Sequence, residues 1–179
     1  MTIVREDAAQ IIGVISDTHG MIRSEAIAAL QGSNLIIHAG DIGSRHVLEA
    51  LKAIAPVVAI RGNNDTEPWA EAIPTARVVK IAGVQIYLLH DLHDLTLDPV
   101  AKHFHAVISG HSHRPSIAER NEVLFINPGS AGPRRFNLPV SVARLHIHHQ
   151  ALQAKLIELT VRKQSEQRST APSIGVRSS

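Results

Sequence analysis

Short apolar runs and helical stretches alternate along the first third of the chain. Runs rich in β-branched residues at 11–15, 35–39 and 57–60 each have the length of a buried strand. Segment 24–30 has helical composition, with Ser24 as a candidate cap, and apolar residues recur with a helical period over 44–54. This β-α-β-α-β order predicts a parallel sheet with helices packed on it.

The rest of the chain is dominated by predicted strands. Segments 77–81 and 84–89 flank a short turn and indicate a hairpin. Further strands are expected at 106–109, 116–119, 123–126, 140–148 and 152–159. We therefore expect one domain over residues 1–161, followed by a polar tail at 162–179 that is predicted to be flexible.

Composition excludes several classes of protein. A chain of 179 residues with 44% hydrophobic content can bury one core, and the absence of cysteine excludes disulfides and thiolate chemistry. A net charge of +2 and 3% aromatic residues indicate no clear nucleic-acid surface. No apolar run is long enough for a membrane span or a signal peptide, so we expect a soluble, cytoplasmic protein.

Polar residues directly follow five of the predicted strands, at points where ligand sites form in open α/β sheets. They are Asp17 and His19, Asp41, Asn63 to Asp65, His90, and His111 and His113. Residues two apart on an extended backbone point the same way, so Asp17 and His19 are expected to face one ligand together. Taken singly, each motif also fits an ordinary polar turn. Five coincidences at strand ends favour a shared site for divalent cations, which imidazole and carboxylate groups suit.

The ordered set Asp17-x-His19, Gly40-Asp41, Gly62-Asn63-Asn64-Asp65, His90 and Gly110-His111-x-His113 resembles the calcineurin-like metallophosphoesterase superfamily. The run Asn127-Pro128-Gly129-Ser130, followed by Pro133-Arg134, is similar to the small single-domain bacterial and archaeal phosphodiesterases related to the retromer subunit of that fold. This resemblance implies an α/β fold of four layers, α-β-β-α, in which two mixed β-sheets pack face to face with helices outside.

The same resemblance implies a binuclear metal centre. One metal would be held by Asp17, His19, Asp41 and His113, and the other by Asp41, Asn63, His90 and His111. Manganese is expected to support activity, with Zn, Fe, Co, Ni or Mg left open. A metal-bridging hydroxide would attack phosphorus in line. The implied activity is that of a metal-dependent phosphoric ester hydrolase, with a phosphodiesterase favoured and a small phosphate ester as substrate.

Two residues depart from the pattern of the family. Asn64, expected with Asp41 to be catalytic, stands where many relatives carry a His that serves the leaving group. An amide cannot donate a proton at neutral pH, so we expect weak activity on esters with poor leaving groups. Asp91 replaces the usual Gly after His90 and is interpreted as a crowded turn rather than a partner of a ligand. His38, inside a predicted strand, is expected to be a satisfied core histidine.

A binding scaffold that keeps the fold without useful catalysis is the alternative function. The complete set of ligands favours an enzyme, because a scaffold under no chemical constraint could lose any of them. A protein Ser/Thr phosphatase is disfavoured, since Gly40-Asp41 continues as Ile42-Gly43-Ser44 and not as Asp-Arg-Gly. The physiological substrate and the formation of a homo-oligomer stay open at this point.

Overall fold

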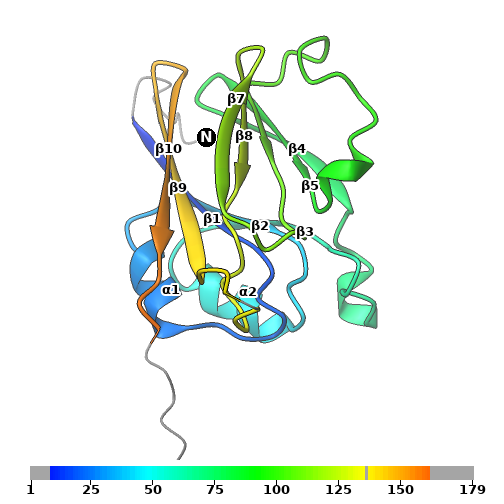
Figure 1. Cartoon of the computed structure of the whole chain (residues 1–179), viewed down its shortest axis with the longest axis vertical. Helices are drawn as coiled ribbons and strands as arrows, with labels where there is room; N and C mark the ends of the chain where they lie inside the picture. Colours follow the sequence, from blue (N-terminus) through cyan, green and yellow to red (C-terminus); the bar gives the residue numbers. More distant parts are fainter. Residues whose placement is uncertain (1–8, 136, 162–179) are drawn as a thin grey trace, which may run out of the picture.

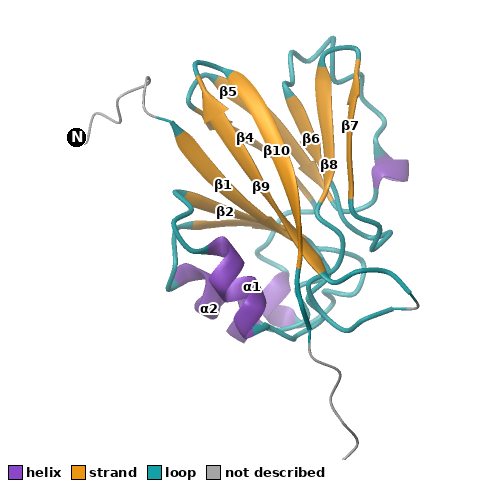
Figure 2. Ribbon diagram, turned by 60° about the vertical axis from the view of Figure 1, so that its left-hand side comes forward, coloured by secondary structure: helices purple, strands orange, loops and turns teal. Residues whose placement is uncertain are grey.

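Two five-stranded β-sheets face each other in the computed structural model, which describes residues 9–135 and 137–161 (Figures 1 and 2). The predicted tail at 162–179 lies outside the described residues. Both sheets contain parallel and antiparallel pairs, so both are mixed. The two-sheet architecture expected from the motifs is confirmed.

The first sheet is built from both ends of the described chain. Its order is β10 (Ala151–Glu158), β9 (Ser141–His148), β1 (Gln10–Ile15), β2 (Leu35–Ala39) and β3 (Val57–Ile60). The pairs β1–β2 and β2–β3 are parallel, as the β-α-β-α-β pattern predicted. The last two strands form an antiparallel hairpin, and β9 pairs with β1.

The second sheet comes from the middle of the chain. Its order is β4 (Ala76–Ile81), β5 (Val84–Leu89), β6 (Ala106–Ile108), β8 (Val123–Asn127) and β7 (Ser116–Arg120). The predicted hairpin β4–β5 is antiparallel, while β5–β6 and β6–β8 are parallel. The carboxyl ends of β5, β6 and β8 therefore lie at one side of this sheet.

Helices α1 (Ser24–Leu30) and α2 (Arg45–Lys52) both cover the outer face of the first sheet (Figure 2). Ser44 is the N-cap of helix α2, and its side chain accepts a hydrogen bond from the His46 N–H. The expectation that Ser24 caps α1 is wrong. Arg23 occupies the cap position, and Ser24 is the first helical residue and makes no capping bond.

Apolar side chains from both sheets form the main core, with Ile12, Val14, Ile86 and Leu88 fully buried between them. The outer face of the second sheet carries a smaller cluster that includes Leu89 and Val107. Leucines 92 and 95 pack on this cluster from the 3₁₀ turn η2 (Leu92–Asp94) and the loop after it. The outer layer of this sheet is thus a short turn and a loop. The β5–β6 connection lacks a stretch of apolar residues with a helical period that is long enough for an α-helix.

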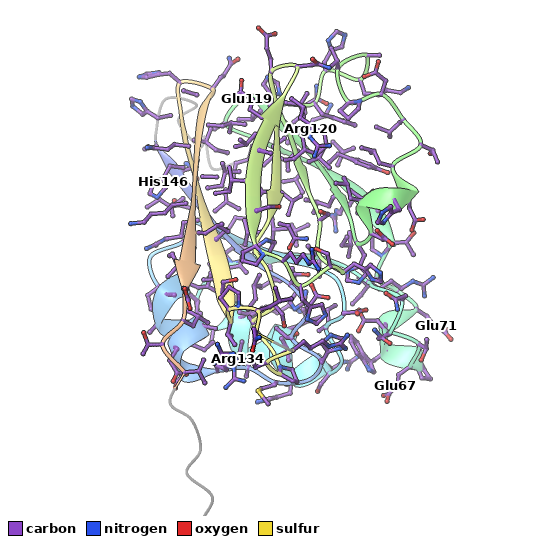
Figure 3. All side chains as sticks on the ribbon, in the orientation of Figure 1. Glu67, Glu71, Glu119, Arg120, Arg134 and His146 are labelled. Carbon is purple, nitrogen blue, oxygen red and sulfur yellow. The ribbon has the colours of Figure 1, made fainter. Side chains whose placement is uncertain are left out.

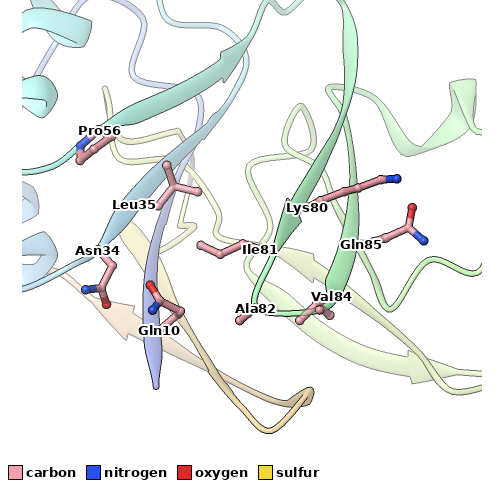
Figure 4. A pocket seen from close by; sticks show the side chains of 10 residues that line it. Gln10, Asn34, Leu35, Pro56, Lys80, Ile81, Ala82, Val84 and Gln85 are labelled. Atoms are coloured by element: carbon pink, nitrogen blue, oxygen red, sulfur yellow. The ribbon is translucent and has the colours of Figure 1, made fainter. Parts of the chain in front are cut away.

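A cavity of about 700 Å³ opens at the amino ends of β1, β2 and β5, away from the strand ends with the predicted ligands (Figure 4). Leu35, Pro56 and Ile81 are among the residues that line it, and it shares no residue with the predicted site. Within the described residues, none of the helices has the length and apolar character needed to cross a membrane.

Candidate metal centre

The carboxyl ends of strands from both sheets meet at one end of the sandwich. Strands β1, β2 and β3 of the first sheet lead into Asp17, Asp41 and Asn63, and strands β5 and β6 of the second lead into His90 and His111. The site therefore lies across two sheets, and not along the edge of one sheet as the comparison with open α/β sheets suggested. Both sheets have a parallel set of strands, and the two sets end on the same side.

Donor atoms from both sheets come close together at the centre of this site. Asp17 Oδ1 lies 3.3 Å from His113 Nε2 and 3.9 Å from His90 Nε2. Asp41 Oδ2 lies 3.4 Å from His90 Nε2 and 3.8 Å from His19 Nε2. These contacts join residues from four separate segments, and they bring five of the predicted ligands into one cluster.

The ligand atoms form two overlapping groups in which all atoms lie within 4.8 Å of one another. One group contains Asp17, His19 and His113, and the other contains Asp17, Asp41 and His90. Asp17 belongs to both groups in this arrangement. The contact of Asp41 with both His90 and His19 keeps the predicted sharing of Asp41 geometrically open.

The backbone of the site is left-handed at five of the predicted ligands. Asp17, His19, Asp41, His111 and His113 have φ angles of 53°, 47°, 52°, 65° and 57°. The extended backbone expected to align Asp17 with His19 is therefore absent, since β1 ends at Ile15. Residues held at positive φ without being glycine cost about 1–3 kcal/mol each and gather at functional sites. The side chains are aimed by these tight turns.

Glycines allow the loops to approach one another closely. A Cβ at Gly110 would collide with Ser16 Oγ and with Asp17 Oδ2, and a Cβ at Gly40 would lie 2.5 Å from His90 Nδ1. Any side chain at either position would displace a predicted ligand. The backbone strain adds to this at Gly40, where φ is 93°.

Asp17 Oδ1 and His90 Nε2 are among the buried atoms of the cluster that lack a hydrogen-bond partner within the described residues. His90 Nδ1 lies 2.7 Å from the Ala39 carbonyl oxygen, which can only accept, so Nδ1 carries the hydrogen and Nε2 the lone pair. Leaving such atoms unsatisfied costs about 1–3 kcal/mol each. A divalent cation would satisfy both atoms, so the residues present fit a bound metal.

Asp41 is 2% exposed and is kept ionised by its neighbours. Burial acts to raise the pKa of Asp41, but the neighbouring His90 ring and two hydrogen bonds from Asn64 together outweigh burial and hold that pKa well below its usual range. The Asn64 N–H donates to Oδ1 over 2.9 Å, and its side-chain amide donates to Oδ2 over 2.6 Å. The predicted catalytic amide is thus in direct contact with a predicted ligand.

His90 responds to the same neighbours. Burial acts to lower the pKa of His90, but Asp41 and the Ala39 carbonyl oxygen outweigh burial, so the pKa is raised. Burial also lowers the pKa of His19, against the opposing effect of Asp41 and Asp17. A proton and a cation would compete for the His90 lone pair.

His111 and Asn63 lie next to the central cluster. The His111 ring packs edge-on against His90 with centroids 5.2 Å apart, and His111 Nδ1 lies 3.1 Å from Asn63 Oδ1. His111 Nε2 faces Asp91 Oδ2 at 3.4 Å. Asp91 also begins η2, where its Oδ1 accepts from the His93 N–H. The interpretation of Asp91 as only a crowded turn is therefore incomplete, because its carboxylate also contacts a predicted ligand.

Several buried polar residues hold the loops in place, and sequence reasoning gave them little weight. Asp65, which the sequence showed only as the last residue of a polar run, accepts hydrogen bonds from the N–H groups of Ile42, Gly43 and Gly62. It thereby joins the loop after β2 to the loop after β3. The Ser16 hydroxyl donates to Asp17 Oδ2 over 2.6 Å. The position of Ser16, between the end of β1 and the predicted ligand Asp17, was the sequence feature that could have indicated this role.

His38 is fully buried in β2, as a core histidine was expected to be. Its Nε2 lies 2.9 Å from the Thr18 hydroxyl, but its Nδ1 has no partner among the described residues. Burial lowers the pKa of His38 from 6.5 to about 4. The side chain is therefore neutral at pH 7, and it is only half satisfied.

The two-sheet sandwich with a carboxylate and imidazole cluster at its strand ends is the architecture of one known family. Residues 11–150 match the calcineurin-like phosphoesterase superfamily domain, and the chain belongs to this family. The family is one of divalent-metal-dependent phosphoesterases, and the chain has the candidate ligand groups for such metals.

The relatives agree with this assignment. A probable metallophosphoesterase of Methanothermobacter thermautotrophicus is 35% identical over 159 residues, which cover 82% of this chain and 91% of the relative. The solved structure of an archaeal phosphodiesterase superposes with a TM-score of 0.69 at 25% identity, covering 83% of this chain and 100% of that one. The structure of vacuolar protein sorting 29 from Cryptosporidium parvum superposes with a TM-score of 0.68 at 20% identity, covering 86% of this chain and 99% of that one. A likeness at this identity shows the fold alone.

Proposed function

We propose that this protein is a phosphodiesterase that uses two divalent cations, with manganese supporting its activity, to hydrolyse a small phosphate ester. The observation that carries the proposal is the pair of unsatisfied buried atoms, Asp17 Oδ1 and His90 Nε2, within a cluster of further carboxylates and imidazoles. A similar solved structure is described as an archaeal phosphodiesterase, which supports a diester as the substrate.

The proposed ligands divide between two cations. Asp17, His19, Asp41 and His113 would hold one cation, and Asp41, Asn63, His90 and His111 the other. The first set is supported by the short contacts of His113 with Asp17 and of His19 with Asp41. The second set is supported by the contact of His90 with Asp41 and by the pairing of His111 with Asn63.

Bound divalent cations would supply Lewis acidity toward the phosphoryl oxygens and a nucleophile at neutral pH. The residues of the chain prepare the site for this chemistry. The Ala39 carbonyl oxygen fixes the His90 tautomer so that Nε2 is free to bind, and Asp41 stays ionised at neutral pH. Asp65 holds the two loops that carry Asp41 and Asn63 at a constant separation.

Asn64 is proposed to act at the leaving-group side of the ester. Its amide can donate a hydrogen bond to an ester oxygen, but it cannot donate a proton. In the structure this amide donates to Asp41 Oδ2, so contact with substrate would require the side chain to exchange that bond for one to the ester. The role is consistent with efficient hydrolysis only of esters whose leaving groups need no proton.

The scaffold alternative is not favoured. The likeness to vacuolar protein sorting 29 lies at 20% identity and concerns the fold alone. By contrast, every proposed ligand is present, and five of them adopt left-handed backbone conformations that a scaffold would have no reason to retain.

The test is hydrolysis of bis-p-nitrophenyl phosphate with and without manganese. Activity should depend on the metal and should fall by more than about a hundredfold in Asp41→Ala. Glu119→Gln is the matched control and should retain full activity, because Glu119 is an exposed charge on β7 (labelled in Figure 3) that pairs with Leu124 near the amino end of β8, away from the strand ends that carry the site. Activity that survives Asp41→Ala, or that chelation of metal does not reduce, would exclude this site as its origin.

Two further questions concern the location and the oligomeric state of the protein. A cytoplasmic location stays a prediction, and self-association into a homo-oligomer stays an open possibility. Fractionation of cells and light scattering of the purified protein would test them.

A further inference from the structure

A second cavity, of about 420 Å³, borders the candidate metal centre. It shares Asn63, His90 and His111 with the centre, so a group bound in it would be continuous with an ester bound at the metals. Pockets for small organic ligands are typically about 300–1,000 Å³ in volume. The cavity is therefore large enough for an organic group attached to the phosphate.

One wall of this cavity is apolar and is held rigidly. Ala76, Tyr87 and Leu89 line it from the hairpin β4–β5. The Tyr87 ring is stacked on Phe104 with centroids 5.2 Å apart and an interplanar angle of 5°. A half-buried aromatic ring fixed in this way offers planar apolar surface at little cost in entropy.

The rest of the lining carries opposite charges that do not pair with each other. Arg61 and Asp94 both line the cavity, yet within the described residues neither side chain makes a hydrogen bond or an ion pair. A free guanidinium can donate to a phosphate oxygen, and a free carboxylate can accept from hydroxyl or amino groups. The cavity thus combines recognition of an anion, a planar apolar group and hydrogen-bond donors.

We propose that this cavity is the subsite for the nucleoside of a nucleoside phosphodiester. The inference rests on the proposed function and narrows its substrate. Arg61 contacts the phosphate, the base lies against the wall that includes Tyr87, and Asp94 accepts hydrogen bonds from sugar hydroxyls or base amino groups. A choline headgroup is the competing occupant, because Asp91 and Asp94 also line the cavity and could attract its ammonium group. A methyl group would leave most of the cavity unfilled.

The experiment compares three p-nitrophenyl diesters with the same leaving group. They are the p-nitrophenyl esters of thymidine 5′-phosphate, of methyl phosphate and of phosphorylcholine. The thymidine ester should be hydrolysed with kcat/KM about tenfold or more above the other two, since one hydrogen bond to a charged group corresponds to about that factor. Equal values for the thymidine and methyl esters, or a preference for the choline ester, would overturn the proposal.

Two variants test the cavity: Asp94→Asn tests the preference for the nucleoside, and Arg61→Gln tests the contact with the phosphate. Asp94→Asn and Arg61→Gln should each raise KM for the thymidine ester about fivefold to tenfold, and Asp94→Asn should leave the methyl ester unchanged. The controls are Glu67→Gln for Asp94→Asn and Arg77→Gln for Arg61→Gln. Glu67 and Arg77 are exposed residues of matching charge that do not line the cavity (Glu67 is labelled in Figure 3). A preference that is the same in all four variants would place recognition of the nucleoside elsewhere.

A binding measurement separates failure of the subsite from failure of the proposed function. Line broadening of thymidine resonances should occur with the metal-free protein and should be lost in Asp94→Asn but not in Glu67→Gln. If no ester is hydrolysed but thymidine binds in this pattern, the proposed activity fails and the subsite stands. If bis-p-nitrophenyl phosphate is hydrolysed but thymidine does not bind, the subsite fails alone.

Discussion

Replacing Asp17 by Asn should stabilise the protein when no metal is bound, and should make it less stable than the wild type when metal is bound. In the metal-free protein, Asp17 Oδ1 is buried and has no hydrogen-bond partner within residues 9–135 and 137–161, and Asp41 adds a second buried carboxylate to the cluster. An Asn at this position can keep one oxygen for the Ser16 hydroxyl and the His111 N–H. Its amide NH₂ would then replace Oδ1, 3.3 Å from His113 Nε2, and could donate to that atom.

The size of the effect follows from the unsatisfied atom. An unpaired buried acceptor costs about 1–3 kcal/mol, so Asp17→Asn should stabilise the metal-free protein by about 1–2 kcal/mol. For a chain of this size, each kcal/mol shifts Tm by about 2–4 °C, which predicts a rise of about 2–8 °C. Metal at a hundred times its Kd stabilises the wild type by about 2.7 kcal/mol, or about 5–11 °C, and the variant should lose most of this gain.

Thermal melts followed by circular dichroism at pH 8, first in EDTA and then in excess manganese, would measure both values. The exposed Glu67→Gln should follow the wild type in both buffers. The inference that Asp17 Oδ1 binds a cation would be refuted if the variant melted below the wild type in EDTA. It would also be refuted if manganese raised the Tm of the variant as much as that of the wild type.

Three further changes have defined outcomes. Asn64→His should raise kcat on diesters with poor leaving groups, such as dialkyl phosphates, and leave bis-p-nitrophenyl phosphate nearly unchanged; an equal or lower rate on the poor substrates would contradict the assigned role. Because burial lowers the pKa of His38 to about 4, protonation is disfavoured in the folded state. The free energy of unfolding should therefore fall by about 3 kcal/mol as pH drops from 6.5 to 4, and urea titrations of His38→Asn should lack this component. Gly110→Ala should displace Asp17 and cost about 1–3 kcal/mol, with manganese affinity by calorimetry reduced more than in Ala118→Gly, a control on β7.

Most strands could be predicted because each is a short apolar run with clear ends. Strands β2 and β3 coincide with the expected segments, as do both strands of the β4–β5 hairpin within one residue. Tertiary packing rarely alters the secondary structure of such runs, because a short, continuous apolar run already indicates a buried strand. The cap of α1 was less predictable, because a serine at a helix start can be the cap or the first helical residue.

The identities of the candidate ligands could also be predicted, but their geometry could not. Asp17, His19 and Asp41 were identified from their positions after apolar runs and from the resemblance to a known family. That they stand on left-handed backbone and not on extended strand could not be deduced from spacing. Spacing gives a direction only when the backbone conformation is known, and here the tight turns set that conformation.

The sequence alone determined the order of the elements, the membership in a metallophosphoesterase family and the set of donor groups, since these depend on local composition and on motifs. Only the tertiary structure decided that the site spans two sheets, that Asp65 joins two loops, and that Asp91 reaches His111. It also decided that Arg61 and Asp94 share a cavity with the site. Contacts between residues distant in sequence depend on how the sheets pack, and no local pattern encodes that packing.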